Sequence, residues 1–132
     1  MISVKSETMP LAKNLALVLD DEWIIAEGLS TQLSSFGFED VARFGSSKEA
    51  LEFLAEIAPK QPDFAILDVS LSRGDNSLDV AIALHEKDIP FWFMTGYGRK
   101  NELSEKFADV ETLTKPVFEQ DLVRRLKGLW PD

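Results

Sequence analysis

The run Leu-Ala-Leu-Val-Leu-Asp-Asp at residues 15–21 indicates the fold, because five apolar residues end abruptly in two acids. A short continuous apolar run bounded by polar residues is typical of a strand buried on both faces of a sheet. Similar runs recur along the chain. We predict strands at Leu15–Leu19, Asp40–Phe44, Asp63–Leu67, Pro90–Thr95 and Val110–Thr114.

Stretches with apolar residues at helical spacing separate these runs. Gly37 ends the first of them, Ser46 or Ser47 caps the second, and Ser70–Ser77 is a predicted loop before the third. A polar helix over Lys100–Phe107 is the predicted fourth helix, and Pro116 opens the fifth and last. The apolar positions of the other four helices include Ile25, Leu29 and Leu33 in the first, Ala50 and Leu54 in the second, Leu78 and Leu84 in the third, and Phe118, Leu122, Leu126 and Leu129 in the last. Five strands alternating with five helices predict an α/β protein with a mostly parallel sheet covered on both faces.

Length and composition set limits on the function. A chain of 132 residues suits one domain, and we expect residues 1–14 to form a flexible tail and residues 15–132 a single domain with no output domain. The net charge of −9, with no cluster of Lys and Arg, argues against direct nucleic-acid binding. The absence of cysteine excludes disulfides and Cys nucleophiles, and we expect a cytoplasmic protein without a signal peptide or membrane span.

Polar side chains that can bind ligands or react lie at the ends of the predicted strands. Asp20 and Asp21 follow the first strand, Asp68 the third and Lys115 the fifth, while Thr95 ends the fourth. The carboxyl ends of parallel strands form the ligand-binding edge of such sheets, so these side chains are expected to converge. Crowded carboxylates repel unless a cation lies among them, and an all-oxygen set suits Mg²⁺ or Mn²⁺. A carboxylate can carry a phosphoryl group, whose oxygens the hydroxyl and the ammonium would bind.

In this order and spacing, Asp20-Asp21, Asp68, Thr95 and Lys115-Pro116 resemble the CheY-like receiver domains of two-component response regulators, over nearly the whole chain. The resemblance implies a flavodoxin-like, doubly wound, five-stranded parallel sheet in the order 2-1-3-4-5. It also implies a signalling protein that a sensor histidine kinase or a histidine phosphotransfer protein phosphorylates, and not a turnover enzyme. Such a protein would pass on its signal by binding another protein, or would act by removing phosphate from a kinase. We expect a monomer or a weak dimer.

The resemblance also implies roles for single residues at the metal site. Asp68 matches the phosphoacceptor. Asp21 matches a direct Mg²⁺ ligand, Asp20 the acid that holds the metal through water, and Ser70 the residue whose backbone carbonyl is a ligand.

Other positions match the parts of the family that respond to phosphorylation. Thr95 matches the switch hydroxyl, Lys115 the ammonium that pairs with the phosphoryl group, and Pro116 a proline that is often cis-linked. Thr112 stands where many receivers carry an aromatic switch residue, which makes Tyr97 the candidate to replace it.

The run Pro-Phe-Trp-Phe-Met-Thr-Gly-Tyr-Gly at residues 90–98 resembles the FAT GUY subgroup of stand-alone receivers. This likeness implies a role in stress signalling. Met94 departs from the usual Ala of that subgroup.

Three other interpretations are open at this point. A haloacid-dehalogenase-type phosphatase would use a similar residue set, although its paired acids are spaced D-x-D and Asp20 and Asp21 are adjacent. A pseudo-receiver would keep the fold as a phosphate-independent binding module, which the unusual Thr112 permits. Asp20, Asp21 and Glu22 would also suit the solvated first turn of a helix, where carboxylates favour the dipole.

Overall fold

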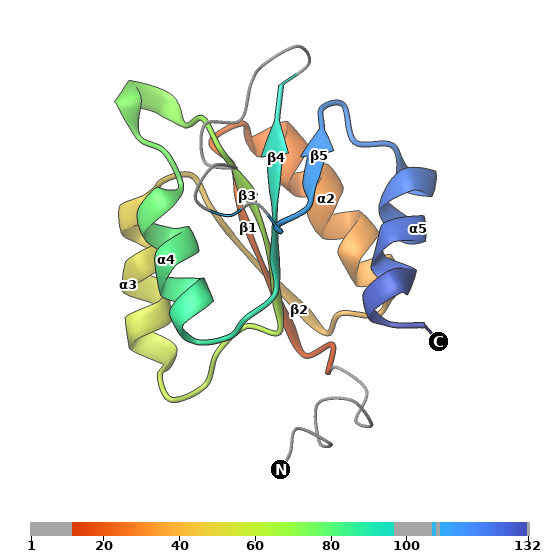
Figure 1. Cartoon of the computed structure of the whole chain (residues 1–132), viewed down its shortest axis with the longest axis horizontal. Coiled ribbons are helices and arrows are strands. Elements are labelled where there is room, and N and C mark those ends of the chain that lie inside the picture. The colour runs from red at the N-terminus through yellow and green to blue at the C-terminus, as the bar shows by residue number, and fades with distance from the viewer. Residues whose placement is uncertain (1–11, 97–106, 108, 132) are drawn as a thin grey trace.

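The computed structural model describes residues 12–96, 107 and 109–131. These residues build one parallel sheet with strands in the order β2-β1-β3-β4-β5 (Figure 1). The strands are β1 (Leu15–Leu19), β2 (Asp40–Phe44), β3 (Phe64–Asp68), β4 (Phe91–Thr95) and β5 (Thr112–Thr114). The predicted flavodoxin-like order is therefore confirmed.

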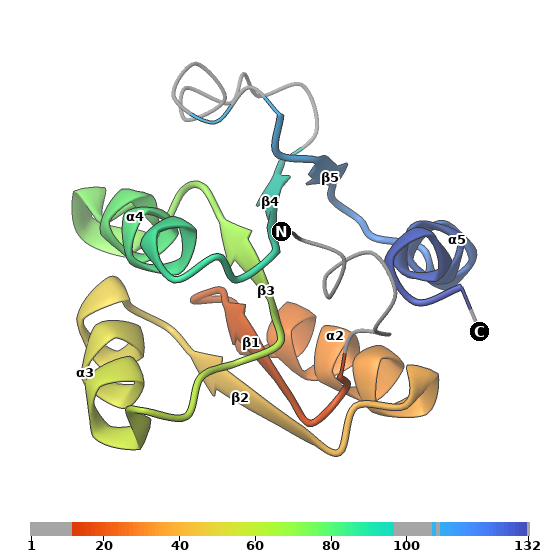
Figure 2. The ribbon, with the colours of Figure 1, turned by 60° about the horizontal axis from the view of Figure 1, so that its bottom comes forward.

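Helices cover both faces of the sheet, as Figures 1 and 2 show from two directions. Helices α2 (Trp23–Phe36) and α5 (Glu119–Leu129) lie on one face, and α3 (Ser47–Ile57) and α4 (Leu78–Glu86) lie on the other. The described part of the chain thus contains four of the five predicted α-helices, and none of these is long and apolar enough to cross a membrane. The predicted helix over Lys100–Phe107 lies outside the described residues, apart from Phe107.

Two apolar layers hold the strands in place. Every residue of β3 and β4 is buried, because both strands lie in the middle of the sheet between helices. Phe64 is fully buried and packs edge-on against Trp92 and Trp130, at ring-centroid distances of 4.8 and 5.5 Å. Burial of such a side chain contributes about 2–3 kcal/mol. The residues that follow these strands are therefore attached to a rigid support.

The local signals of the sequence are largely confirmed. Ser46 caps α3 by accepting a hydrogen bond from the Glu49 backbone N–H (3.2 Å), and Gly37 ends α2 with a φ of 131°. The Lys115–Pro116 peptide bond is cis, as the family resemblance implied. A short 3₁₀ turn, η1 (Ser72–Gly74), lies within the segment that was predicted to be a loop.

Three predictions about the last part of the chain were wrong. Pro116 does not open the last helix, because the chain is still extended at Phe118 and α5 begins only at Glu119. Phe118 is 68% exposed instead of buried, because α5 begins at Glu119 and Phe118 is its extended N-cap residue. The fifth strand starts at Thr112 and not at Val110, since the Val110 backbone N–H donates to the Phe107 carbonyl (3.0 Å) in a turn.

Candidate functional site

The register of the parallel strands brings the polar strand endings to one edge. Leu19 is level with Leu67, and Asp68 is level with Met94, so that Asp20, Asp68 and Thr95 follow one another across three neighbouring strands. The Lys115 backbone N–H donates to the Thr95 carbonyl (2.8 Å), which places Lys115 beside them. Asp20, Asp68 and Thr95 are all at most 5% exposed, although their side chains are polar.

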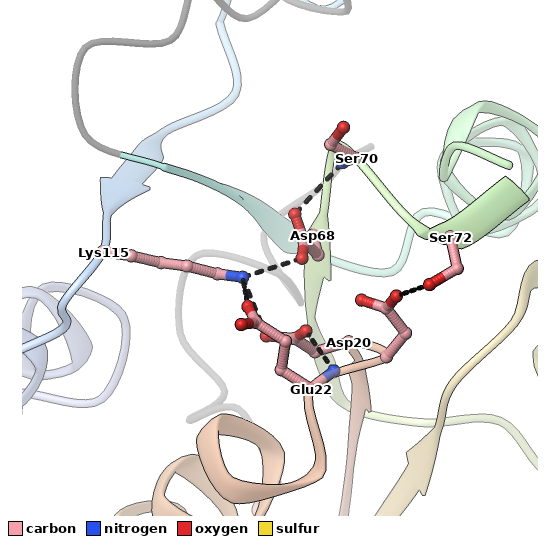
Figure 3. Close-up of polar contacts among 7 residues, drawn as sticks. Asp20, Glu22, Asp68, Ser70, Ser72 and Lys115 are labelled. Carbon is pink, nitrogen blue, oxygen red and sulfur yellow. Dashed lines mark hydrogen bonds and ion pairs between the residues drawn. The ribbon is translucent and has the colours of Figure 1, made fainter. Parts of the chain in front are cut away.

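The Lys115 ammonium is the centre of this edge (Figure 3). Its Nζ lies 2.8 Å from Asp68 Oδ2, 2.8 Å from Glu22 Oε1 and 3.2 Å from Asp20 Oδ2. Backbone N–H groups hold the other oxygens of the two aspartates: Glu22 donates to Asp20 Oδ1 (2.9 Å) and Ser70 to Asp68 Oδ1 (3.1 Å). Asp20 and Asp68 are therefore fixed from two sides.

Proximity and burial change the proton affinities of this group. Burial raises the pKa of Asp20 from 3.8 to about 6; the Asp68 charge adds to the rise, and the Glu22 N–H and the Lys115 ammonium oppose it. Burial alone would lower the pKa of Lys115, but hydrogen bonds to Asp68 and Glu22 outweigh it and leave that pKa above its ordinary value. Lys115 is therefore a permanent positive charge at neutral pH, whereas Asp20 keeps its negative charge at a cost.

The three carboxylates predicted to hold a metal do come together. Asp20, Asp21 and Asp68 each offer an oxygen, and these atoms lie within 4.8 Å of one another. Two ligands on opposite sides of a Mg²⁺ ion lie about 4 Å apart, so this set can share one such ion after small adjustments. Donors that are all carboxylate oxygens also suit Mg²⁺ better than softer metals. The residues present therefore fit the cation that the sequence implied.

Thr95 ends β4 at the same edge of the sheet as Asp20 and Asp68. Its Oγ1 is buried and has no hydrogen-bond partner among the described residues. A buried hydroxyl without a partner is costly, and a ligand with acceptor oxygens would remove that cost. Thr112 is level with Phe93, two residues before Thr95 on β4, while Tyr97 lies outside the described residues. The proposed switch roles of Thr112 and Tyr97 stay predictions.

The structure adds two residues that sequence reasoning missed. Glu22 bonds Lys115 through its side chain, and Ser72 donates a hydrogen bond from its hydroxyl to Asp21 Oδ2. Ser72 is 51 residues from Asp21 in the chain, and no local pattern marks the pair. Glu22 was visible only as a third acid at a helix start, a common feature without further meaning.

A pocket adjoins the acid pair on the α2 side. It has a volume of about 450 Å³ and is lined by Asp20, Asp21, Trp23 and Arg43, among others. Trp23, at the start of α2, is 70% exposed. His85, on α4, is exposed.

Comparison with known proteins identifies the class that this fold and site define. Residues 16–127 match the model of the response regulator receiver domain. The chain belongs to the response regulator receiver domain family.

Individual relatives agree with this assignment. The chain is 31% identical to "Response regulator MprA" of Mycolicibacterium vanbaalenii over 121 residues, which cover 86% of this chain and 48% of that protein. Among solved structures, SdrG from Sphingomonas melonis Fr1 is 33% identical, with a TM-score of 0.74 over 92% of this chain and 98% of SdrG. A putative response regulator from Chloroflexus aurantiacus is 27% identical, with a TM-score of 0.73 over 92% of this chain and all of that one. The chain spans about half the length of the curated relatives it matches.

Proposed function

We propose that this protein is a phosphorylated signalling receiver in which Asp68 accepts the phosphoryl group. The observation that supports it most strongly is the arrangement of Asp68 itself. Its buried carboxylate accepts from the Lys115 ammonium at 2.8 Å and is one of three acids able to share a cation. Asp68 also ends β3, beside the strand β4 that carries the unpartnered Thr95 hydroxyl. Each of these features corresponds to one requirement of phosphoryl transfer to a carboxylate.

In the proposed reaction, a carboxylate oxygen of Asp68 attacks the phosphorus of the donor. A new O–P bond forms, the bond between phosphorus and the donor atom breaks, and the electron pair leaves with the donor. The Lys115 ammonium and the Thr95 hydroxyl then bind oxygens of the transferred group. The Ser70 backbone N–H keeps Asp68 oriented through its hydrogen bond to Oδ1.

A divalent cation would be held by Asp20, Asp21 and Asp68, with the Ser70 carbonyl as a further proposed ligand. When bound, Mg²⁺ offsets the negative charge that builds up on the phosphoryl oxygens. The acids thus serve as its ligands, and Asp68 additionally as the acceptor.

The physiological donor is proposed to be a phosphohistidine of a sensor kinase or a phosphotransfer protein, as for the family. Receiver domains are generally not turnover enzymes, and we propose no turnover here. The output is proposed to be phosphorylation-dependent protein binding or removal of phosphate from a kinase. Membership of the FAT GUY subgroup, with a role in stress signalling, is also a proposal; it rests on the run at residues 90–98.

The test is the intact-protein mass after incubation with acetyl phosphate, with and without Mg²⁺. The wild type should gain about 80 Da only with Mg²⁺, and Asp68→Asn should gain nothing. Because some receivers require their kinase, the same measurement with a phosphorylated histidine phosphotransfer protein as donor completes it. A folded protein that gains no mass from either donor contradicts the proposal and favours the pseudo-receiver.

A further inference from the structure

The Glu22 carboxylate accepts a hydrogen bond from the Lys115 ammonium, and the proposed chemistry gives this contact no role. An ammonium has three N–H donors, and here three carboxylate oxygens, from Asp20, Glu22 and Asp68, lie within 3.2 Å of Lys115 Nζ. A phosphoryl group on Asp68 needs the same ammonium. One of the three present partners must therefore give up its place when the phosphoryl oxygen arrives.

The three carboxylates differ in how easily they can leave. The side chains of Asp20 and Asp68 are 0% and 4% exposed, and each accepts a second hydrogen bond from the backbone. The Glu22 side chain is 60% exposed, and Lys115 is its only recorded side-chain partner within the described residues. Glu22 is also the N-cap residue of α2, yet its side chain makes no capping hydrogen bond. Its carboxylate is thus directed to the ammonium and is free to turn into solvent.

We propose that Glu22 is a positioning residue for Lys115, which holds the ammonium in the unphosphorylated protein and is displaced when Asp68 receives the phosphoryl group. This inference rests on the proposed function of Asp68. By competing with the phosphoryl oxygen for the Lys115 ammonium, Glu22 slows phosphorylation. An exposed ion pair contributes little free energy, so the expected effect is about two- to fivefold in rate and not several orders of magnitude.

Contact and general charge predict different results for matched variants. Glu22→Gln removes the charge, and Glu22→Asp keeps it on a side chain one methylene shorter, which weakens its reach to Lys115. Glu27→Gln removes one charge from an exposed position on the same helix. Glu27 lines the pocket beside Asp20 and Asp21 but is not one of the carboxylates that bond the Lys115 ammonium. Only competition for the ammonium predicts that both Glu22 variants differ from Glu27→Gln.

The experiment is the initial rate of mass gain with acetyl phosphate and saturating Mg²⁺, measured at two salt concentrations. Glu22→Gln and Glu22→Asp should both react about two- to fivefold faster than the wild type, at either salt concentration, and Glu27→Gln should match the wild type. Equal acceleration by Glu22→Gln and Glu27→Gln, with Glu22→Asp like the wild type, would overturn the inference, because charge alone would then explain the rates.

A second measurement needs no phosphorylation. Lysine acylation, mapped by peptide mass spectrometry, should modify Lys115 faster in both Glu22 variants, with the exposed Lys127 as the internal reference. Unchanged labelling of Lys115 in both variants would overturn the inference by itself. A wild type that takes no phosphoryl group from any donor would instead disprove the proposed function, and this result is seen before any variant is compared.

Discussion

The body of the sheet and its carboxyl edge follow opposite rules. In the body, the residues of β1, β3 and β4 are packed between two apolar layers, and Phe64 and Phe93 are fully buried. At the edge, one step further along the same strands, Asp20, Asp68 and Thr95 are almost as deeply buried but carry charges or an unpartnered hydroxyl. The body therefore stabilises the protein, while the edge lowers its stability and keeps reactive groups ready for a cation and an anion.

The largest expected effect is on the body. Phe64→Ala should lower the free energy of unfolding by about 3–5 kcal/mol, because it removes a fully buried ring and leaves a cavity. Urea or guanidinium unfolding measures it. Phe118→Ala is the matched control: its ring is 68% exposed, and its stability should stay within about 0.5 kcal/mol of the wild type. Similar losses for the two variants would mean that the layers are not packed as described.

At the carboxyl edge, a substitution is expected to raise the free energy of unfolding instead of lowering it. Without divalent metal at neutral pH, Asp20→Asn should raise the free energy of unfolding by about 1–2 kcal/mol, because an amide of the same shape avoids the cost of a buried charge. The same variant should lose most of the stabilisation by Mg²⁺, which thermal unfolding with and without metal would reveal. Asp40→Asn, at an exposed position, is the control and should change neither quantity. A destabilised Asp20→Asn protein would contradict the claim that the buried charge of Asp20 lowers the stability of the protein.

The third effect depends on pH. The pKa of Asp20 is about 6 in the folded protein and 3.8 ordinarily, so the folded state binds this proton more readily than the unfolded state. Without metal, this group therefore adds stability as the pH falls from about 6 toward 4, and this contribution is lost as the pH rises through 6. Mg²⁺ needs the ionised carboxylate.

The increase in Tm on adding Mg²⁺ should accordingly be larger at about pH 7.5 than at about pH 5. Asp20→Asn, which has no carboxyl at this position, should show a weaker dependence. A metal effect that is constant across this range in the wild type would show that Asp20 does not bind the cation or is not protonated near pH 6.

The smallest effect concerns a hydrogen bond away from the edge, in which Ser46 caps the start of α3. Ser46→Ala removes the cap of α3 and should cost about 1 kcal/mol, without any change in the stabilisation by Mg²⁺. Ser35→Ala, at an exposed position within α2, should have little effect on either quantity. If Ser46→Ala altered the metal effect, the body and the edge would be coupled more closely than the contacts indicate.

Local patterns were sufficient for most of the fold. The bounds of β1 and β2 agree with the prediction, because a buried apolar run and its polar ends are properties of the residues themselves. Phe118 was misplaced for a physical reason. Its spacing from Leu122 suits a helical face, but the chain is still extended at that residue, and periodicity cannot tell where a helix begins.

The sequence by itself determined the alternating strands and helices and the acids, hydroxyl and ammonium at the strand ends, because these depend on residue type and on order along the chain. Only the tertiary structure decided which of these side chains hydrogen-bond to one another and to residues that the sequence did not single out. Glu22 is 93 residues from Lys115, and Ser72 is 51 residues from Asp21. Contacts over such separations depend on strand register and loop path, and the side chains that make them look locally like any exposed acid or hydroxyl.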